Sequence, residues 1–301
     1  MNYFREEIFI VFSLKFKENY LNQPYGDIWH KINLLAYKKH PYQWPTIGKT
    51  LEHIENAKLE DVKSFFFQHY RPNNAIMVVA GKIKAEQVKI LAEKWFGDIP
   101  SGIIAGRNLP VEPRQNEERK ISVQAKVPLD AIYKIYHIGK RIDQNFYIAD
   151  VITNILSLGH SSRFYQQLVK EKKYFSEIDA FVSASLDPGL LIIQGKLVKG
   201  ISMEQAESAI NEELNNIQSK LIGERELQKI KNKIETQLEF EETNLFTKAF
   251  HLAFFELLGD AEMINQESEK YLNISGVDIK NYAQEIFRKD NCSTIYYYAQ
   301  S

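Results

Sequence analysis

The sequence contains a single cysteine, Cys292, so no disulfide can form within its 301 residues. Cys292 falls in the strand-like stretch CSTIYYYA, where a role in side-chain packing is the simplest interpretation. Because one cysteine gives no evidence for or against an oxidising environment, the redox compartment stays undetermined.

An excess of one charge is also missing, because 38 basic residues nearly cancel 39 acidic residues. Lysine and glutamate alternate along the helix-like stretches instead of gathering in one patch. Proteins that bind nucleic acid through its phosphates usually carry a basic surface. We therefore expect no nucleic-acid partner.

Long hydrophobic runs are lacking as well. The apolar stretch IFIVFSLKF, residues 8–16, spans about nine residues, whereas a helix needs about twenty to cross a bilayer. It has neither the basic region nor the small-residue cleavage site of a signal peptide. We expect no membrane span, and the compartment stays open between cytoplasm and periplasm.

Hydrophobic periodicity predicts an α+β protein with helices packed on one face of an antiparallel sheet. Before residue 100 it predicts helices at 27–39, 59–70 and 85–97, with a strand at 75–81. After residue 118 it predicts strands at 120–127, 131–140 and 292–299, a hairpin turning at 187–189, and helices at 145–159, 161–173, 203–221, 224–259 and 276–289. Residues 101–118 lack periodicity and hold several glycines and prolines, which predicts a linker between domains 1–100 and 119–301.

Two distant stretches match at one fixed offset. EDVKSFFFQHYRPNNAIMVVA, from residue 60, aligns with VDIKNYAQEIFRKDNCSTIYYYA, from residue 277, at a spacing of 217 residues. The identical pairs are Asp61 and Asp278, Lys63 and Lys280, Arg71 and Arg288, and Asn74 and Asn291. Two unrelated amphipathic helices would explain the apolar spacing but not the shared arginine and asparagine in the turn.

This offset predicts two homologous domains, the first of them incomplete. The second copy begins near residue 119, so the first would begin about 98 residues before Met1 (119 minus 217). We therefore expect roughly the first half of domain one to be absent from this sequence.

Several motifs resemble the insulinase superfamily of zinc peptidases, which includes pitrilysin and the mitochondrial processing peptidase. These motifs are NQPYGD, HPYQWPTIG, YRPNNAIMVVAG and WFGDIP in the first domain and LSLGHSSRFYQQLVKEK in the second. The resemblance covers nearly the whole chain. It implies a metallopeptidase fold of the inverzincin type and zinc in intact members of the family.

The zinc motif of that family, H-x-x-E-H, does not occur in this sequence. It supplies two histidine ligands and a glutamate general base from one helix. The histidines here are His30, His40, His53, His69, His137, His160 and His251, and no two of them are four residues apart. We expect no catalytic residue and no resident cofactor in this chain, and His40 fits a helix-end cap better than a metal ligand.

The third zinc ligand of the family is a glutamate ahead of the NQP segment, and the matching position here is Lys15. An ammonium group has no free lone pair with which to bind a metal, and Glu6, Glu7 and Glu18 lie off that register. The family's substrate-holding Arg and Tyr align with Val169 and Ser176. Lys170 and Tyr174 lie close enough to be weak candidates for binding substrate.

These observations leave three functional hypotheses. The chain is a non-catalytic subunit that encloses peptide with a zinc-bearing homologous subunit, or it is the C-terminal portion of a zinc endopeptidase. The third hypothesis is a scaffold with no peptide contact. The expected partners are a peptide substrate or a zinc-bearing homologue, a homo-oligomer stays open, and no activity is expected from this chain alone.

Overall fold

The computed structural model describes residues 22–46, 52–104, 106–183 and 185–300, which form two compact units. The first unit holds the described residues up to 46 together with 110–233 and 269–300. The second unit holds the described residues of 52–109 together with 234–268. None of the helices in these ranges is both long enough and apolar enough to span a membrane.

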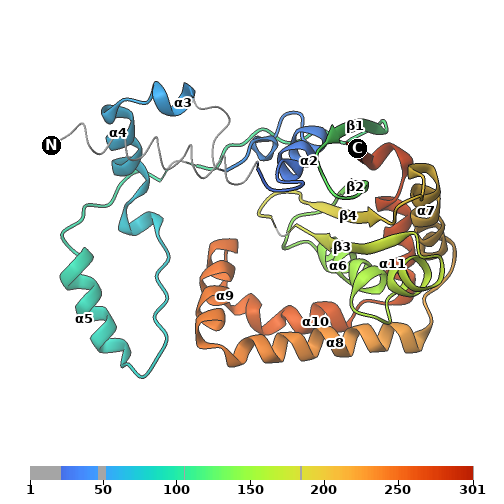
Figure 1. The fold of residues 1–301 in the computed structure, drawn as a ribbon. Helices are drawn as coiled ribbons and strands as arrows, with labels where there is room; N and C mark the ends of the chain where they lie inside the picture. Colours follow the sequence, from blue (N-terminus) through green and yellow to red (C-terminus); the bar gives the residue numbers. More distant parts are fainter. Residues whose placement is uncertain (1–21, 47–51, 105, 184, 301) are drawn as a thin grey trace. The chain divides into compact units, whose positions relative to one another are not determined.

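Among the described residues, the first unit contains a five-stranded sheet with the order β1-β5-β2-β4-β3 (Figure 1). Its strands are β1 (Arg119–Ala125), β2 (Ala131–His137), β3 (Phe175–Val182), β4 (Leu190–Leu197) and β5 (Cys292–Ala299). The pairs β2/β4, β2/β5 and β3/β4 are antiparallel, and β1 runs parallel to β5. The sheet is therefore largely antiparallel, as the sequence predicts.

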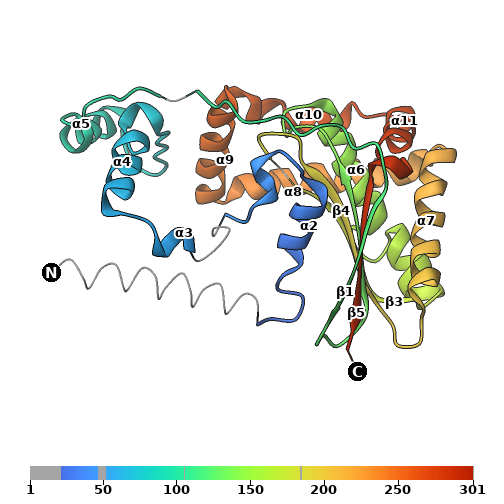
Figure 2. The ribbon, with the colours of Figure 1, turned by 90° about the horizontal axis from the view of Figure 1, so that it is seen from above.

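Three helices cover one face of this sheet (Figure 2): α6 (Gln144–Ser157), α7 (Met203–Ser219) and α11 (Gly276–Ile286). Helix α7 begins at a capping box, because Ser202 Oγ accepts from the backbone N–H of Gln205 at 3.2 Å and Gln205 Oε1 accepts from Ser202 N–H at 3.0 Å. This arrangement satisfies two N–H groups that would otherwise lack partners at the start of the helix. These three helices thus share one face, and the α+β class is confirmed.

Helix α2 (Ile28–Ala36) lies on the opposite face of the same sheet (Figure 2). Ile28, Ile32 and Leu35 recur at helical spacing and are buried. They join a core cluster with inward-facing residues of β2, β4 and β5, including Tyr133, Ile192 and Tyr297. The motifs that open the described chain therefore belong to the first unit.

The segment after α2 is fastened to the first unit by hydrogen bonds. Glu112 accepts from the backbone N–H groups of Lys38, Lys39 and His40 at 2.8–2.9 Å. Tyr37 donates its hydroxyl to the carbonyl oxygen of Pro188 at 3.1 Å, in the turn between β3 and β4. The HPYQ segment is thereby tied to the hairpin turn.

The second unit is helical in the residues described. Its elements are α3 (Glu52–Glu55), α4 (Leu59–His69), η2 (Pro72–Asn74), α5 (Ala85–Phe96), α9 (Leu245–Leu258) and η4 (Ala261–Gln266). Helix α8 (Glu224–Thr243) has residues in both units, and α10 spans Glu267–Leu272. The sequence predicts domains at 1–100 and 119–301 with a linker at 101–118. These limits were taken from the repeat and not from the two units, and they stay a prediction.

The duplication is visible in the secondary structure. Helix α4 and helix α11 begin and end at the predicted offset, and so do η2 and η5 (Lys289–Asn291). Asp61 accepts from the N–H of Lys58 at 3.1 Å, and Asp278 accepts from that of Ser275 at 2.9 Å. Two homologous helix-and-turn units are therefore present.

Three predicted elements differ in the structure. Residues 75–80 are extended but not part of a strand, because no described segment pairs with them and a strand needs a neighbour for its hydrogen bonds. The single helix predicted at 224–259 is divided in two at Asn244, whose side chain caps α9 by accepting from Thr247 N–H at 3.1 Å. The helix predicted at 161–173 contains a π-helical segment, η3 (Tyr165–Glu171).

Candidate functional site

The described residues provide no zinc site. Nowhere in the described ranges do three or more His, Cys, Asp or Glu side chains come together in a group that could hold a metal ion. His137 is used otherwise, because its Nε2 lies 3.1 Å from the carbonyl oxygen of Ala36. Burial lowers the pKa of His137, and Nε2 donates this hydrogen bond, because a carbonyl oxygen can only accept. Lys15, at the predicted third-ligand position, lies outside the described residues.

The weak substrate-binding candidates lie at the end of η3. Lys170 is exposed, and Tyr174 is partly buried just before β3. The backbone of Tyr174 donates to the carbonyl of Leu168 at 3.0 Å and accepts from Val198 N–H at 2.9 Å, which fixes the chain at this point. Neither side chain lines the cavity between α7 and the sheet that is described below, so their role stays a prediction.

His40 forms a cap, at the start of the following helix and not at the end of α2. Its Nδ1 accepts from the backbone N–H of Tyr42 at 3.2 Å, in the first turn of η1 (Pro41–Gln43). Its Nε2 lies 3.2 Å from Oδ2 of Asp187. The imidazole is therefore placed by the fold, which agrees with the interpretation as a cap.

The first copy of the repeat exposes the side chains that the second copy buries. Val62 is 57% exposed, whereas its counterpart Ile279 is 1% exposed. Phe65 is 59% exposed, whereas its counterpart Tyr282 is 7% exposed. We call the exposed set the α4 face, and its members are Val62, Phe65, Phe66 and Tyr70. Exposed apolar side chains gathered on one helix are typical of an interaction surface.

The turn after α4 repeats the hydrogen bonding of the second copy only in part. Asn291 Nδ2 donates to the carbonyl of Ile286 at 2.9 Å and to that of His137 at 3.1 Å, which ties α11 to β2. Asn74 Nδ2 donates to the matching carbonyl of His69 at 2.8 Å. Among the described residues, no strand takes the place of β2 beside Asn74.

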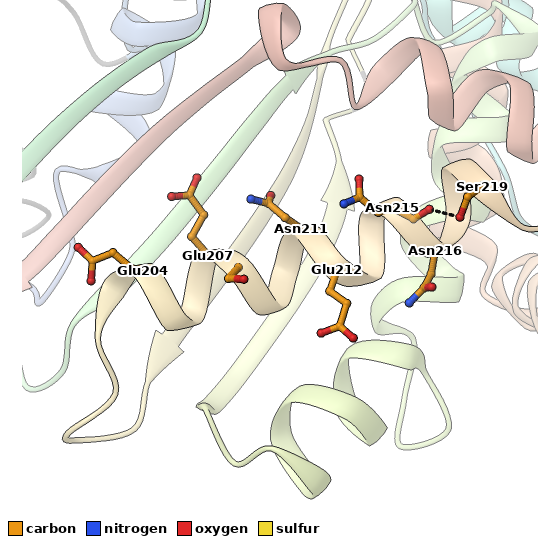
Figure 3. A pocket seen from close by; sticks show the side chains of 8 residues that line it. Glu204, Glu207, Asn211, Glu212, Asn215, Asn216 and Ser219 are labelled. Carbon is orange, nitrogen blue, oxygen red and sulfur yellow. Dashed lines mark hydrogen bonds between the residues drawn. The ribbon is translucent and has the colours of Figure 1, made fainter.

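A polar cavity lies between α7 and the β1–β5–β2 part of the sheet. Figure 3 shows α7 at a neighbouring pocket that shares Glu207, Asn211 and Asn215 with this cavity; these three follow one another every four residues and point to the same side of α7, whereas Glu212 points to the other side. The cavity has a volume of about 400 Å³, and its wall includes Lys134 from β2.

Sequence reasoning missed this cavity, although two signals for it are present. Lys134 interrupts an apolar alternation between Ile132 and Tyr136 on a strand buried on both faces. On α7 the polar residues Glu207, Asn211 and Asn215 recur every four residues, each one position after a member of the buried stripe Ala206, Ile210 and Leu214. Neither signal forms a known motif, so only the fold brings them together.

Comparison with known families gives one match over more than half of the chain. Residues 56–234 match the sequence model described as "Peptidase M16 inactive domain". The matched range includes α4 of the first copy and extends into α8 of the second.

Relatives are found among bacterial zinc proteases. The chain is 24% identical over 283 residues to the "Zinc protease PqqE" of Helicobacter pylori, covering 91% of this chain and 62% of that protein. It is 25% identical over 270 residues to the "Uncharacterized zinc protease YmxG" of Bacillus subtilis, covering 88% of this chain and 64% of that protein. The chain thus spans less than two thirds of either relative.

The fold is also found in a solved structure. The crystal structure of a protease from Helicobacter pylori superimposes with a TM-score of 0.89 at 22% identity, covering 99% of this chain and 72% of that chain. At this identity the likeness concerns the fold alone.

Proposed function

This chain belongs to the peptidase M16 family, and from that membership we propose that it is a non-catalytic portion of a zinc peptidase that encloses peptide together with a zinc-bearing homologous polypeptide. The matched family model is that of the inactive domain, and the resemblance to insulinase-type zinc peptidases is confirmed. Zinc and the hydrolytic step would come from the homologous polypeptide, because the described residues do not fit the metal.

The observation that carries the proposal is the contrast between the two copies of the repeat. Helix α11 buries its apolar side chains within the first unit. The side chains of the α4 face recur at the same spacing but are exposed. The extended residues after Asn74 correspond to β5, which lies between β1 and β2 in the second copy. A homologous polypeptide that supplies two such strands would bury the α4 face and pair residues 75–82.

The first test measures cleavage of an unstructured, internally quenched peptide. The chain alone should show no cleavage, and mixing with a separately purified zinc-bearing M16 homologue should give cleavage that a chelator abolishes. In a parallel arm the chain is extended at its N-terminus with the homologue's zinc-bearing segment. Activity only in the mixture favours a helper subunit, and activity only in the extended chain favours a portion of one enzyme.

The second test asks whether the α4 face makes the contact. Phe65→Asp should abolish the cleavage gained on mixing, because it places a charge at the apolar contact. Val277→Asp is the matched control, since Val277 is similarly exposed on the second copy. Equal cleavage with Phe65→Asp would exclude this face, and no cleavage in any arm would favour the scaffold hypothesis.

A further inference from the structure

Lys134 has an unusual position for a lysine. It lies in the middle of β2, its side chain is 3% exposed, and its neighbours on the same face, Ile132 and Tyr136, are buried. Removing an ammonium group from water is unfavourable unless other groups compensate for the lost hydration. Lys134 Nζ donates to Oε1 of Glu207 on α7 at 2.8 Å, which provides part of that compensation.

The ammonium of Lys134 has donors left over. A lysine ammonium carries three N–H donors, and among the described residues Lys134 Nζ donates only to Glu207. The same side chain lines the cavity of about 400 Å³. At about 30 Å³ for each water, the cavity would hold roughly a dozen water molecules or a small organic ligand.

Each carboxylate oxygen of Glu207 already accepts a hydrogen bond from a neighbouring side chain. Glu207 accepts from the hydroxyl of Tyr296 at 2.7 Å as well as from Lys134. Burial alone would raise the pKa of Glu207, but the hydrogen bonds from Lys134 and Tyr296 lower it below its usual value. Burial and the contact with Glu207 raise the pKa of Tyr296 to about 12. Glu207 is therefore an ionised acceptor held by these two donors.

The remaining charges leave an excess of one positive charge on the cavity wall. Glu118 lies 3.0 Å from Lys120 and 3.7 Å from Lys289. With Lys134 and Glu207, the wall has three lysines against two glutamates, and the side chain of one of the lysines, Lys289, is 84% exposed. A ligand with one negative charge would balance the cavity.

The other wall residues are suited to an organic molecule. Only small parts of Leu214, Tyr136 and Phe287, each at most 8% exposed, provide the apolar part of the wall, and the amides of Asn211 and Asn215 can donate or accept hydrogen bonds. Phosphate, with two negative charges and no apolar part, fits this wall less well than a carboxylate with an aliphatic tail.

We propose that the cavity between α7 and the β1–β5–β2 part of the sheet binds a small monocarboxylate with a short aliphatic tail. The carboxylate accepts from the free donors of Lys134, and the tail lies against Leu214 and Phe287. This inference does not depend on the proposed function, because every residue of the cavity lies in the first unit.

The experiment is a calorimetric titration of the purified chain with N-acetyl-leucine. N-acetyl-leucinamide, which has the same shape without the negative charge, is the matched probe. The carboxylate should bind at least about tenfold more tightly than the amide, because a charge-assisted hydrogen bond is lost in the amide. Isovalerate and a tripeptide ending in leucine are titrated in parallel. Their affinities show whether the bound carboxylate belongs to a free short acid or to the C-terminus of a peptide.

Two variants test whether the ligand binds in this cavity. Lys134→Met with Glu207→Gln removes the donor without leaving a buried charge unpaired, and Asn211→Trp fills the cavity without changing charge. Both should weaken binding of N-acetyl-leucine at least about tenfold, whereas Lys248→Met, at an exposed ion pair in the second unit, should not change it. If the double variant does not fold, Asn211→Trp decides. Equal binding of acid and amide, no binding, or unchanged affinity in the folded variants would overturn the proposal.

Discussion

Arg119 Nη1 lies 2.6 Å from the carbonyl oxygen of Ala36 and also donates to Leu35 at 3.0 Å. The guanidinium thus joins the start of β1 to the last turn of α2. A cation at a helix C-terminus is favourable, because the last carbonyl groups have no partner within the helix. The docking of α2 therefore depends on this charge as well as on buried apolar side chains.

We expect Arg119→Met to lower the free energy of unfolding by about 1.5–3 kcal/mol, the usual effect of hydrogen bonds that involve a charged group. The measurement is urea denaturation followed by circular dichroism. Arg225→Met, at an exposed position, should change stability by less than about 0.5 kcal/mol. An Arg119→Met variant as stable as the parent would show that the apolar contacts alone hold α2.

The repeat makes a paired prediction for Asn291 and Asn74. Asn291→Ala removes two hydrogen bonds and leaves the carbonyls of Ile286 and His137 unpaired, so it should cost about 2–4 kcal/mol. Asn74→Ala removes one exposed hydrogen bond and should cost less than about 1 kcal/mol. Thermal melts of the two variants test this, and the reverse order of stability would contradict it.

Stability should depend on the ionisation of Glu112. Burial alone would raise its pKa, but the backbone N–H groups of residues 38–40 outweigh that effect and lower the pKa below the usual value. A carboxyl with a lowered folded pKa stabilises the protein above its unfolded pKa of about 4.3. That contribution is lost as the pH falls through the folded pKa.

Urea midpoints measured from about pH 6 down to about pH 3 test the role of Glu112. Glu112→Gln should lower the midpoint near pH 6 and flatten its decline below about pH 4.3. Glu285→Gln, at an exposed position, should leave the profile unchanged. An identical decline in the Glu112→Gln variant would assign the acid sensitivity to other groups.

We expect this chain to bind no stoichiometric zinc. The sequence has no H-x-x-E-H, and its alignment to the family pattern predicts Lys15 at the third-ligand position. Elemental analysis of dialysed, tag-free protein should find far less than one zinc per chain, with a zinc-bearing M16 homologue as the positive control. About one tightly held zinc per chain would require ligands that the sequence motifs do not reveal.

The repeat and the fold class were predictable because they depend on local signals. Asp61, Asp278 and the two asparagines occupy positions in a helix start and a tight turn that few other residues satisfy. The α6, α7 and α11 helices have apolar faces of ordinary periodicity, so their place on one face of the sheet followed as well.

The remaining features depend on contacts between distant segments. The extended residues after Asn74 have the composition of a strand, but a strand also requires a neighbour, which composition does not specify. The position of α2 on the other face depends on the contacts of Ile32 with the sheet. The cavity was missed because Lys134 and Glu207 are far apart in the sequence and form no recognised spacing.

The place of β5 in the sheet has a consequence for the order of events during synthesis. It follows the other strands in the chain, yet it lies between β1 and β2 and is the described strand that joins them. Until residues 292–299 leave the ribosome, β1 has no neighbour among the described strands, and the edge of β2 that pairs with β5 is open. The sheet is therefore completed by a contact of long sequence separation, and such contacts form slowly and leave open edges liable to aggregate.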